Sequence, residues 1–208
     1  MRPDNNSIGA VILAAGSSSR LGQPKQLLQI GGESLLRRTT RIALETGCRP
    51  VVVVLGSDME RMWEEIADLR VEIVVNFGWE SGMATSLRAG LQGMIMSPAP
   101  PTSTFLLVCD QPYLSKEVLM DLAQARAEKG RIAAVSVYDS GAIGTPCLFT
   151  APLYPELLSL KGEQGARKLI ARLTLEQVAC VPFPQGEIDV DTPEDWEQIS
   201  KELETPRD

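Results

Sequence analysis

The 208-residue chain contains no histidine. Histidine is the commonest general base at active sites and the commonest metal ligand. Its absence excludes the Ser-His-Asp and Cys-His mechanisms of nucleophilic catalysis. The four cysteines, Cys48, Cys109, Cys147 and Cys180, are scattered and form no CxxC pair. Because zinc sites need clustered ligands, we expect these residues to be buried, reduced thiols in a cytoplasmic protein.

Long apolar runs and an excess of positive charge are also missing. No stretch approaches the ~18 apolar residues of a membrane span, and no charged-then-apolar leader opens the chain, which predicts a protein without membrane contact. The net charge is −7, yet residues 16–41 hold five cations against the single acid Glu33. Such a local cationic segment suits a small polyanion better than a nucleic acid, which needs an extended basic face.

Short apolar runs alternate with helical stretches along a chain of single-domain length. The expected strands cover residues 10–14, 51–55, 71–75, 104–109, 132–137, 147–149 and 178–181. The run Val-Val-Val-Val-Leu is continuous, which indicates a strand that is covered on both faces. Strand-helix-strand repetition predicts parallel pairing with right-handed crossovers. We therefore expect an α/β fold with a doubly wound, mostly parallel sheet in a three-layer sandwich.

Three of the expected helices have recognisable ends. They cover residues 34–46, 58–69 and 115–129. Gly47 and Gly130 follow the first and third helices as C-terminal stops. Ser57 and Glu60 form a capping box that opens the second helix, and Ser115 is the N-cap of the third.

A loop rich in glycine and serine follows the first expected strand. Residues 13–25 read L-A-A-G-S-S-S-R-L-G-Q-P-K, and ligands of such sheets bind at the carboxyl ends of the strands. Gly16 and Gly22 let backbone N–H groups face anionic oxygens, while Arg20 and Lys25 supply neutralising charge. The spacing matches neither the Walker loop nor the dinucleotide fingerprint. It predicts a triphosphate-binding loop, and the alternative is an ordinary turn.

Two separated aspartates are candidate metal ligands. Asp110 follows the expected strand 104–109 and should open onto the same crevice as the first loop. Asp191 precedes Thr192 and a proline, which together form a strong helix start. Carboxylates beside a phosphate site predict Mg²⁺ (or Mn²⁺) held by Asp110 and Asp191, because Mg²⁺ takes one or two carboxylates together with phosphate oxygens and water. The alternatives are a helix cap for Asp110 and helix-dipole interactions for the downstream acids.

Together these motifs resemble the molybdenum cofactor nucleotidyltransferase family of MobA- and MocA-like NTP transferases. The likeness rests on L-A-A-G-x-x-x-R-x-G-x-x-K from Leu13, D-Q-P from Asp110 and D-x-D-T-P-E-D from Asp189. It extends through residues 76–90, which contain W-x-x-G-M-x-x-S-L, and so covers nearly the whole chain. In that last segment Met83, Leu87 and Leu91 have the spacing of a core-facing helix stripe.

Two further segments bear on the branch of the family. Gly144-Thr-Pro and Gly162-Glu-Gln-Gly-Ala-Arg resemble the acceptor side, and the second is typical of the cytidylyltransferase branch. The Leu-Ala-Ala-Gly opening has alanine where the guanylyl-transferring branch has a second glycine, which favours a pyrimidine nucleotide. Thr145 departs from the family, because many pterin cytidylyltransferases carry histidine there. Arg167, at an expected helix start, either contacts an anionic acceptor or lies on a solvated helix face.

The resemblance implies a Rossmann-like nucleotidyltransferase fold in one domain, 1–208, with a nucleotide-binding half over about 1–110 and an acceptor-binding half over 111–208. It implies catalytic roles for Arg20, Lys25 and Asp110, and metal binding by Asp110 and Asp191. The implied nucleotide-binding residues are Leu13, Ala14, Ala15, Gly16, Ser17, Ser18, Arg20, Lys25, Gly82, Ser86 and Asp110.

The implied reaction transfers NMP from an NTP, CTP by the branch assignment, to a phosphate monoester, with molybdopterin or molybdenum cofactor as acceptor and pyrophosphate as leaving group. A phosphate nucleophile is anionic near neutral pH, so the reaction needs no general base. Catalysis then depends on alignment and on charge stabilisation by the metal and the cations. The expected partners are these two substrates and a molybdoenzyme or cofactor-insertion protein, with no nucleic acid and no membrane.

Other functions remain open at this stage. One is nucleotidyl transfer to another phosphorylated acceptor, such as a sugar phosphate. Another is a chaperone that binds a nucleotide or cofactor without chemistry. A flavodoxin-like electron carrier is disfavoured by the cationic loop and by the small number of aromatic side chains, three Trp, three Tyr and four Phe.

Overall fold

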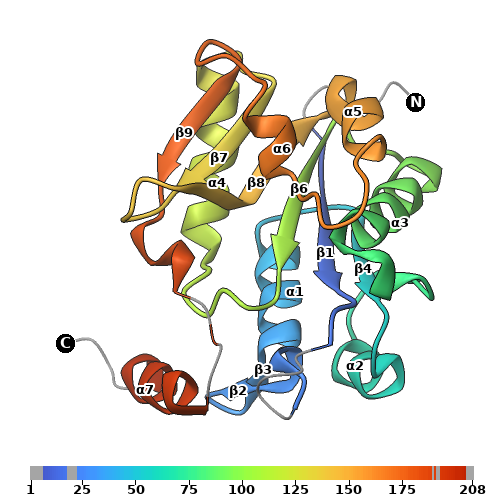
Figure 1. The fold of residues 1–208 in the computed structure, drawn as a ribbon, viewed down its shortest axis with the longest axis vertical. Helices are drawn as coiled ribbons and strands as arrows, with labels where there is room; N and C mark the ends of the chain where they lie inside the picture. Colours follow the sequence, from blue (N-terminus) through green and yellow to red (C-terminus); the bar gives the residue numbers. More distant parts are fainter. Residues whose placement is uncertain (1–6, 18–22, 189, 191–192, 205–208) are drawn as a thin grey trace.

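The computed structural model describes residues 7–17, 23–188, 190 and 193–204 (Figure 1). A seven-stranded sheet has the strand order β5-β4-β1-β6-β8-β7-β9. Its strands are β1 (Ile8–Ala14), β4 (Val51–Leu55), β5 (Glu72–Val75), β6 (Ser103–Val108), β7 (Ala133–Val137), β8 (Ile143–Thr150) and β9 (Val178–Pro182). All seven expected strands are therefore present, and the mostly parallel α/β sheet is confirmed.

Helices cover both faces of the sheet and make a three-layer sandwich. The helices are α1 (Leu35–Glu45), α2 (Met59–Ile66), α3 (Met83–Met96), α4 (Lys116–Glu128), α5 (Tyr154–Leu158), α6 (Arg167–Ile170) and α7 (Pro193–Glu204). One buried cluster joins the sheet to α1, α2 and α4, and a second joins it to α3, α5 and α6. No described helix is long and apolar enough to cross a membrane.

Strand β8 runs antiparallel to both of its neighbours, β6 and β7. Only the short turn 138–142 separates β7 from β8. Because a connection of this length cannot cross over the sheet, the two strands form a hairpin, whereas parallel neighbours need a longer crossover. The remaining neighbouring pairs of the sheet are parallel.

Short elements complete the fold. A small hairpin of β2 (Gln29–Ile30) and β3 (Glu33–Ser34) precedes α1, and α7 packs beside it through a third apolar cluster. Figure 1 shows α7 and β2 together at the lower end of the molecule. The 3-10 turns are η1 (Lys25–Leu27), η2 (Trp79–Ser81), η3 (Ala151–Leu153) and η4 (Pro184–Glu187).

The expected helix ends are confirmed for α1 and α4 but not for α2. The Ser34 and Ser115 side chains accept hydrogen bonds from the third backbone N–H that follows each of them. The capping box of Ser57 and Glu60 is wrong: α2 starts after Asp58, whose φ is 50°, and no side chain caps it. The physical reason is a contact with the loop after β1. The Ser57 N–H donates to the Ala15 carbonyl at 3.0 Å, and the chain turns into the helix only at the next residue.

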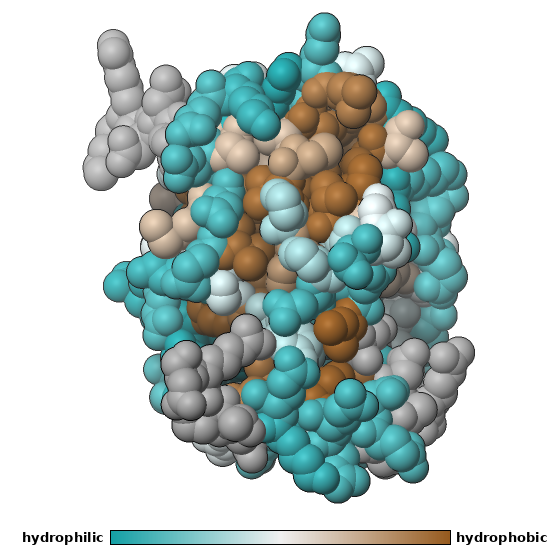
Figure 2. Space-filling model, turned by 90° about the vertical axis from the view of Figure 1, so that its left-hand side faces the viewer, coloured by the Kyte–Doolittle hydropathy of each residue, from teal (hydrophilic) through white to brown (hydrophobic). Residues whose placement is uncertain are grey.

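The sheet has two edge strands, β5 and β9. Strand β9 forms one edge and includes Pro182, a residue tolerated on edge strands because it lacks an N–H. Figure 2 shows this side of the molecule, where brown apolar residues gather in the upper part and teal ones surround them. Cys180 of β9 is exposed, which corrects the expectation that all four cysteines are buried; Cys48, Cys109 and Cys147 are.

Candidate active site

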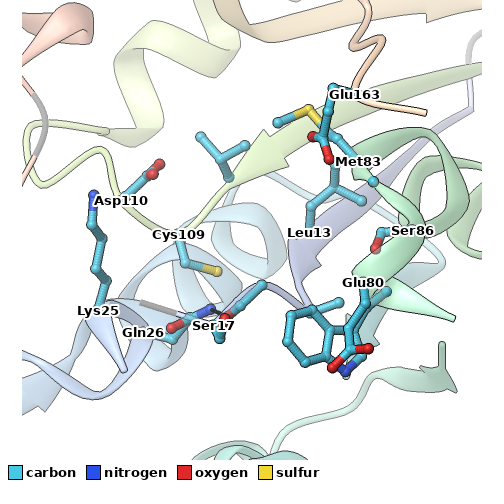
Figure 3. Close-up of a pocket in the computed structure, with 15 residues that line it drawn as sticks. Leu13, Ser17, Lys25, Gln26, Glu80, Met83, Ser86, Cys109, Asp110 and Glu163 are labelled. Carbon is cyan, nitrogen blue, oxygen red and sulfur yellow. Dashed lines mark hydrogen bonds between the residues drawn. The ribbon is translucent and has the colours of Figure 1, made fainter. Parts of the chain in front are cut away.

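A cavity of about 400 Å³ opens at the carboxyl ends of β1 and β6 (Figure 3). It is lined by Leu13, Ala15, Gly16, Ser17, Lys25, Gln26, Trp79, Glu80, Gly82, Met83, Ser86, Val108, Cys109, Asp110 and Glu163. We call it the first cavity. Segments far apart in the sequence meet here because parallel strands β1 and β6 are direct neighbours and end at the same edge of the sheet.

The loop after β1 contributes backbone and small side chains to the first cavity. Leu13, Ala15, Gly16 and Ser17 line it as the sequence indicates. Ala14 does not: it is buried on the opposite face with α1 and α4, because successive residues of a strand point to opposite sides. The structure therefore does not bring the Ala14 side chain into the site. Ser18 and Arg20 lie outside the described residues.

Gln26 holds this loop in place and was not recognised in the sequence. Its side chain is buried, and its Nε2 donates to the carbonyl of Gly16 at 2.8 Å and to that of Ala14 at 3.3 Å. Two carbonyls, one at the end of β1 and one in the loop after it, are thereby satisfied, which fixes the start of the loop. A glutamine one residue after the expected phosphate-binding lysine gives no distinctive signal in a single sequence.

Lys25 and Asp110 line the same cavity, although they are far apart in the sequence. Lys25 opens η1, and Asp110 follows β6 directly. In Figure 3 the Lys25 ammonium group extends along the side of the cavity on which the Asp110 carboxylate lies. Cys109, which precedes Asp110 in the sequence, is buried, and this burial, helped by the charge of Asp110, raises the pKa of its thiol. The thiol stays neutral, so the charges on this wall come from the lysine and the carboxylate.

The opposite wall is formed by the segment that enters α3. Gly82 has φ = 104°, a conformation that favours glycine, and a Cβ there would overlap the backbone of Gly162. Asn76 donates from Nδ2 to the Ser86 hydroxyl at 3.0 Å and to the Thr85 hydroxyl at 2.8 Å. Ser86 is therefore oriented by a buried amide beside the cavity.

Three further residues of this wall went unrecognised or were misjudged from the sequence. Trp79 and Glu80 line the cavity but were not chosen as site residues. Met83 was expected in the core with Leu87 and Leu91, and that expectation is wrong for Met83, which is 46% exposed. As the first residue of α3, it precedes the turns that pack on the sheet. Leu87 and Leu91 are buried as expected.

A second cavity of about 560 Å³ adjoins the first. It is lined by Leu13, Met83, Leu106, Val108, Asp110, Gln111, Tyr138, Gly144, Thr145, Cys147, Glu163, Gly165, Ala166, Arg167, Lys168, Ile170, Gly186, Glu187 and Ile188. Both cavities share Leu13, Met83, Val108, Asp110 and Glu163. The two form one cleft, and Asp110 lies at their junction.

Gln111 ties together three segments that form the wall of the second cavity. Its buried Nε2 donates to the carbonyl of Gly186 at 2.6 Å, to that of Thr145 at 2.8 Å and to the Tyr138 hydroxyl at 3.2 Å. Tyr138 in turn donates to the Thr145 carbonyl at 2.7 Å. Because Gln111 follows Asp110 directly, its hydrogen bonds fix the position of Asp110 relative to Tyr138, Thr145 and Gly186 on the far wall of the second cavity.

Two cations face the apolar floor of the second cavity. Arg167 and Lys168 open α6 and line the cavity, and both are exposed. Beneath them Cys147 is buried, which raises the pKa of its thiol to about 12, although the nearby Arg167 opposes the rise. The cavity thus combines an apolar floor with two cations and with three acids, Asp110, Glu163 and Glu187.

The described residues include one of the two expected metal ligands. Asp110 lies at the junction, whereas Asp191 lies outside the described residues. Within the described ranges no group of three or more His, Cys, Asp or Glu could hold a metal by itself. A single carboxylate in a cavity open to phosphate oxygens still fits Mg²⁺ or Mn²⁺, which commonly take one or two carboxylates and complete the shell with phosphate and water.

Comparison with known proteins agrees with this architecture. Residues 10–178 match the MobA-like NTP transferase domain. Nicotine blue oxidoreductase of Paenarthrobacter nicotinovorans is 35% identical over 90% of this chain and 93% of its own. Molybdenum cofactor cytidylyltransferase of Escherichia coli is 26% identical over 92% and 94%.

Solved structures give the same picture of the fold. Rv0371c from Mycobacterium tuberculosis aligns with a TM-score of 0.80 and 29% identity, covering 97% of this chain and 100% of that one. The same protein in complex with manganese aligns with a TM-score of 0.75 and 26% identity, over 94% of this chain and 98% of that one. The chain therefore belongs to the MobA-like NTP transferase family, and nucleotidyl transfer is the kind of reaction that this membership supports.

Proposed function

We propose that the chain transfers a cytidylyl group from CTP to the phosphate monoester of a pterin-type acceptor, with molybdopterin or molybdenum cofactor as the acceptor. The observation that carries this proposal is the shape of the cleft. Lys25 and Asp110 line the first cavity, and Asp110 also lines the second, where Arg167 and Lys168 lie. A donor triphosphate and an acceptor phosphate can meet at that junction.

The proposed chemistry needs no general base. An oxygen of the acceptor phosphate attacks the α-phosphorus of the nucleotide, a new P–O bond forms, and the bond to the bridging oxygen of the β-phosphate breaks. Pyrophosphate leaves with that electron pair. Lys25 stabilises charge on the phosphates, the loop after β1 offers backbone N–H groups to them, and both substrates are held in line. A chain without histidine can perform this reaction.

A divalent cation, Mg²⁺ or Mn²⁺, belongs to the proposal. The related Rv0371c was crystallised with manganese. In this chain Asp110 would hold the ion, with Asp191 as the further carboxylate implied by the family motif. When bound, the ion would supply charge stabilisation for the transferring phosphate.

The acceptor assignment rests on the second cavity. Its apolar floor includes Leu106, Cys147 and Ile170, and its rim carries Arg167 and Lys168. A flat heteroaromatic ring suits the floor, and a phosphate suits the cations. The base assignment rests on the cytidylyltransferase-like motifs and on the relative from Escherichia coli.

The test incubates the purified chain with Mg²⁺ or Mn²⁺, each of the four nucleoside triphosphates, and acceptors that include molybdopterin, a sugar phosphate and methylerythritol phosphate. We expect pyrophosphate release with CTP and molybdopterin, at least tenfold above every other pair. Lys25→Met should remove this activity, while Lys116→Met, on the exposed start of α4, should retain it.

The same experiment includes the outcomes that contradict the proposal. Turnover with another phosphorylated acceptor alone would support nucleotidyl transfer but contradict molybdopterin as the acceptor. Metal-dependent nucleotide binding without turnover across the panel would instead indicate a binding chaperone. Because one relative carries the name of an oxidoreductase, oxidation of NADH and NADPH with nicotine blue is measured as well. Such oxidation without pyrophosphate release would overturn the transferase proposal.

A further inference from the structure

An apolar surface surrounds the edge strand β5. This strand pairs with β4 and stands at the end of the strand order. Five large apolar side chains near it are exposed: Trp63 52%, Val75 37%, Phe77 85%, Ile95 40% and Met96 84%. We call these residues, with β5 itself, the β5 edge surface. Exposed apolar groups concentrated in one place indicate a binding surface rather than ordinary scatter.

The β5 edge surface has apolar side chains on both sides of the strand. On the side of α2 a groove of about 370 Å³ is lined by Leu55, Met59, Glu60, Trp63, Glu64, Ile73 and Val75. On the other side lies the end of α3, with Ile95 and Met96. The Ser97 hydroxyl donates to the Glu72 carboxylate at 3.4 Å, which places this helix end beside the start of β5. Figure 1 shows α2 and α3 together on the right-hand side of the molecule.

The same surface is acidic. Residues 58–81 contain seven acids and two bases. Glu60, Glu64 and Glu72 are exposed around the groove and the strand. A symmetric dimer through this surface would bring two copies of the same acidic patch together. Charge complementarity therefore favours a basic partner over a second copy of the chain.

We propose that the β5 edge surface binds an extended segment of another protein, one that alternates basic and apolar residues and adds as a strand beside β5. An edge strand offers unpaired backbone donors and acceptors to such a segment. Side chains of an added strand point alternately to the two faces of the sheet. One set would meet the groove at Trp63 and Val75, and the other would meet Ile95 and Met96. Basic residues of the segment would lie near the three glutamates.

The location gives the surface a connection to the cleft. Strand β5 leads through Asn76 and Phe77 into η2, where Trp79 and Glu80 line the first cavity. A segment bound at β5 would thus lie beside the rim of the nucleotide cavity. The proposal holds whether or not the chain transfers nucleotides, because it depends on this surface alone.

The test uses the ¹⁵N-labelled full chain and a synthetic, end-blocked octapeptide that alternates lysine with valine. A peptide alternating glutamate with valine is the matched control. We expect saturable shifts of the amide signals of residues 72–77 and of the Trp63 indole N–H with the lysine peptide, weakening as salt is raised. The glutamate peptide should produce none.

Variants separate the surface from nonspecific binding. Trp63→Ala, and the double change Glu60→Lys with Glu64→Lys, should each lower affinity for the lysine peptide at least tenfold. Leu175→Ala and Glu156→Lys remove or reverse exposed groups elsewhere and should bind as the unaltered chain does. Circular dichroism checks that every variant is folded.

Three results would overturn the proposal. The first is an absence of shifts at residues 72–77 up to the solubility limit of the lysine peptide. The second is equal binding of the two peptides. The third is a concentration-dependent dimer, seen by sedimentation, that Trp63→Ala removes, because the occupant would then be a second copy of the chain.

Discussion

Both cavities combine separate segments of the chain, but only the first includes a continuous stretch of the phosphate-loop region. The end of β1 and the loop after it supply Leu13, Ala15, Gly16 and Ser17. In the second cavity, Gln111 joins residues that lie up to 75 positions away in the chain. The difference teaches that part of the first cavity is set by the local conformation of one loop, while the wall of the second cavity is set by a hydrogen-bond network between distant segments. Under the proposed function, we call the first cavity the donor side and the second the acceptor side.

Substitution of Asp110 should lower the activity most, because this residue lines both cavities. Asp110→Asn keeps the shape and removes the charge, and we expect the rate of pyrophosphate release to fall by about 10²–10³. Asp121→Asn, on the exposed face of α4, is the matched control and should leave the rate within twofold. A fall of less than tenfold in folded Asp110→Asn would remove this carboxylate from the mechanism.

Gln111→Glu tests whether acceptor binding in the second cavity can be weakened without weakening nucleotide binding in the first. Replacing a donor by a carboxylate opposite two carbonyls and a hydroxyl leaves buried groups unpaired, at a cost of about 1–3 kcal/mol or more for a charged group. We expect KM for the acceptor to rise at least tenfold, while KM for the nucleotide changes less than threefold.

Gln29→Glu, on the exposed strand β2, is the control for the added charge. Equal changes in the two KM values would show that the Gln111 network supports the whole cleft and would contradict the distinction between its sides. Steady-state kinetics with each substrate varied separately gives both values.

Gly82→Ala tests the contact between the start of α3 and the loop at residues 162–163, whose Glu163 lines both cavities. Gly82 needs a positive φ, and a Cβ would lie 2.9 Å from the Glu163 backbone nitrogen as well as overlapping Gly162. We expect a loss of about 1–3 kcal/mol in unfolding free energy from the backbone conformation alone, and higher KM values for both substrates. Gly141→Ala has a similar φ of 80° with nothing within 4 Å.

The comparison of these two alanine variants in urea unfolding separates conformational strain from displacement of the loop at residues 162–163. If Gly141→Ala lowers stability as much as Gly82→Ala and both retain activity, the contact between this loop and α3 does not join the two sides.

Arg167→Met should affect the acceptor side more mildly. An exposed cation that contacts a phosphate contributes less than a buried one, so we expect about a tenfold rise in KM for the acceptor and an unchanged KM for the nucleotide. Arg172→Met, an exposed arginine beyond α6, is the control. An unchanged acceptor KM would place Arg167 on a solvated helix face.

The smallest effect concerns an ion pair between β3 and α1, away from the residues that line the two cavities. Arg41 donates from Nε and from one terminal nitrogen to the two carboxylate oxygens of Glu33, at 2.8 and 2.9 Å, and this contact lowers the pKa of Glu33 below its ordinary 4.5. A lowered folded-state pKa stabilises the fold above the ordinary value, and the contribution is lost as pH falls below 4.5.

We therefore expect Glu33→Gln to be less stable than the unaltered chain by less than about 1 kcal/mol at pH 7, because the pair is partly exposed. The difference should shrink below pH 4.5. Urea unfolding between pH 3 and pH 7 measures it, and a difference that grows on acidification would contradict the assigned cause.

The sequence alone determined the succession of strands and helices along the chain and the position of the loop after β1. Continuous valine and leucine runs identify buried strands from the sequence alone, and glycine with serine after such a run identifies a loop. Asp110 was recognisable because it directly follows such a run, and Lys25 because it ends the glycine- and serine-rich motif that follows the first run. The family resemblance, carried by short motifs, is confirmed by the match over residues 10–178.

Only the tertiary structure decided which side chains face the cleft and what holds them. Ala14 turns away from the site, Met83 turns toward it, and Gln26 and Gln111 act as donors to carbonyls that no local pattern pairs with them. Strand pleating and burial select one side chain over its neighbour, and hydrogen bonds between distant segments form only once the sheet has brought those segments together. The physical reason is range: local backbone preferences are set by adjacent residues, whereas pairing across the cleft depends on the packed sheet.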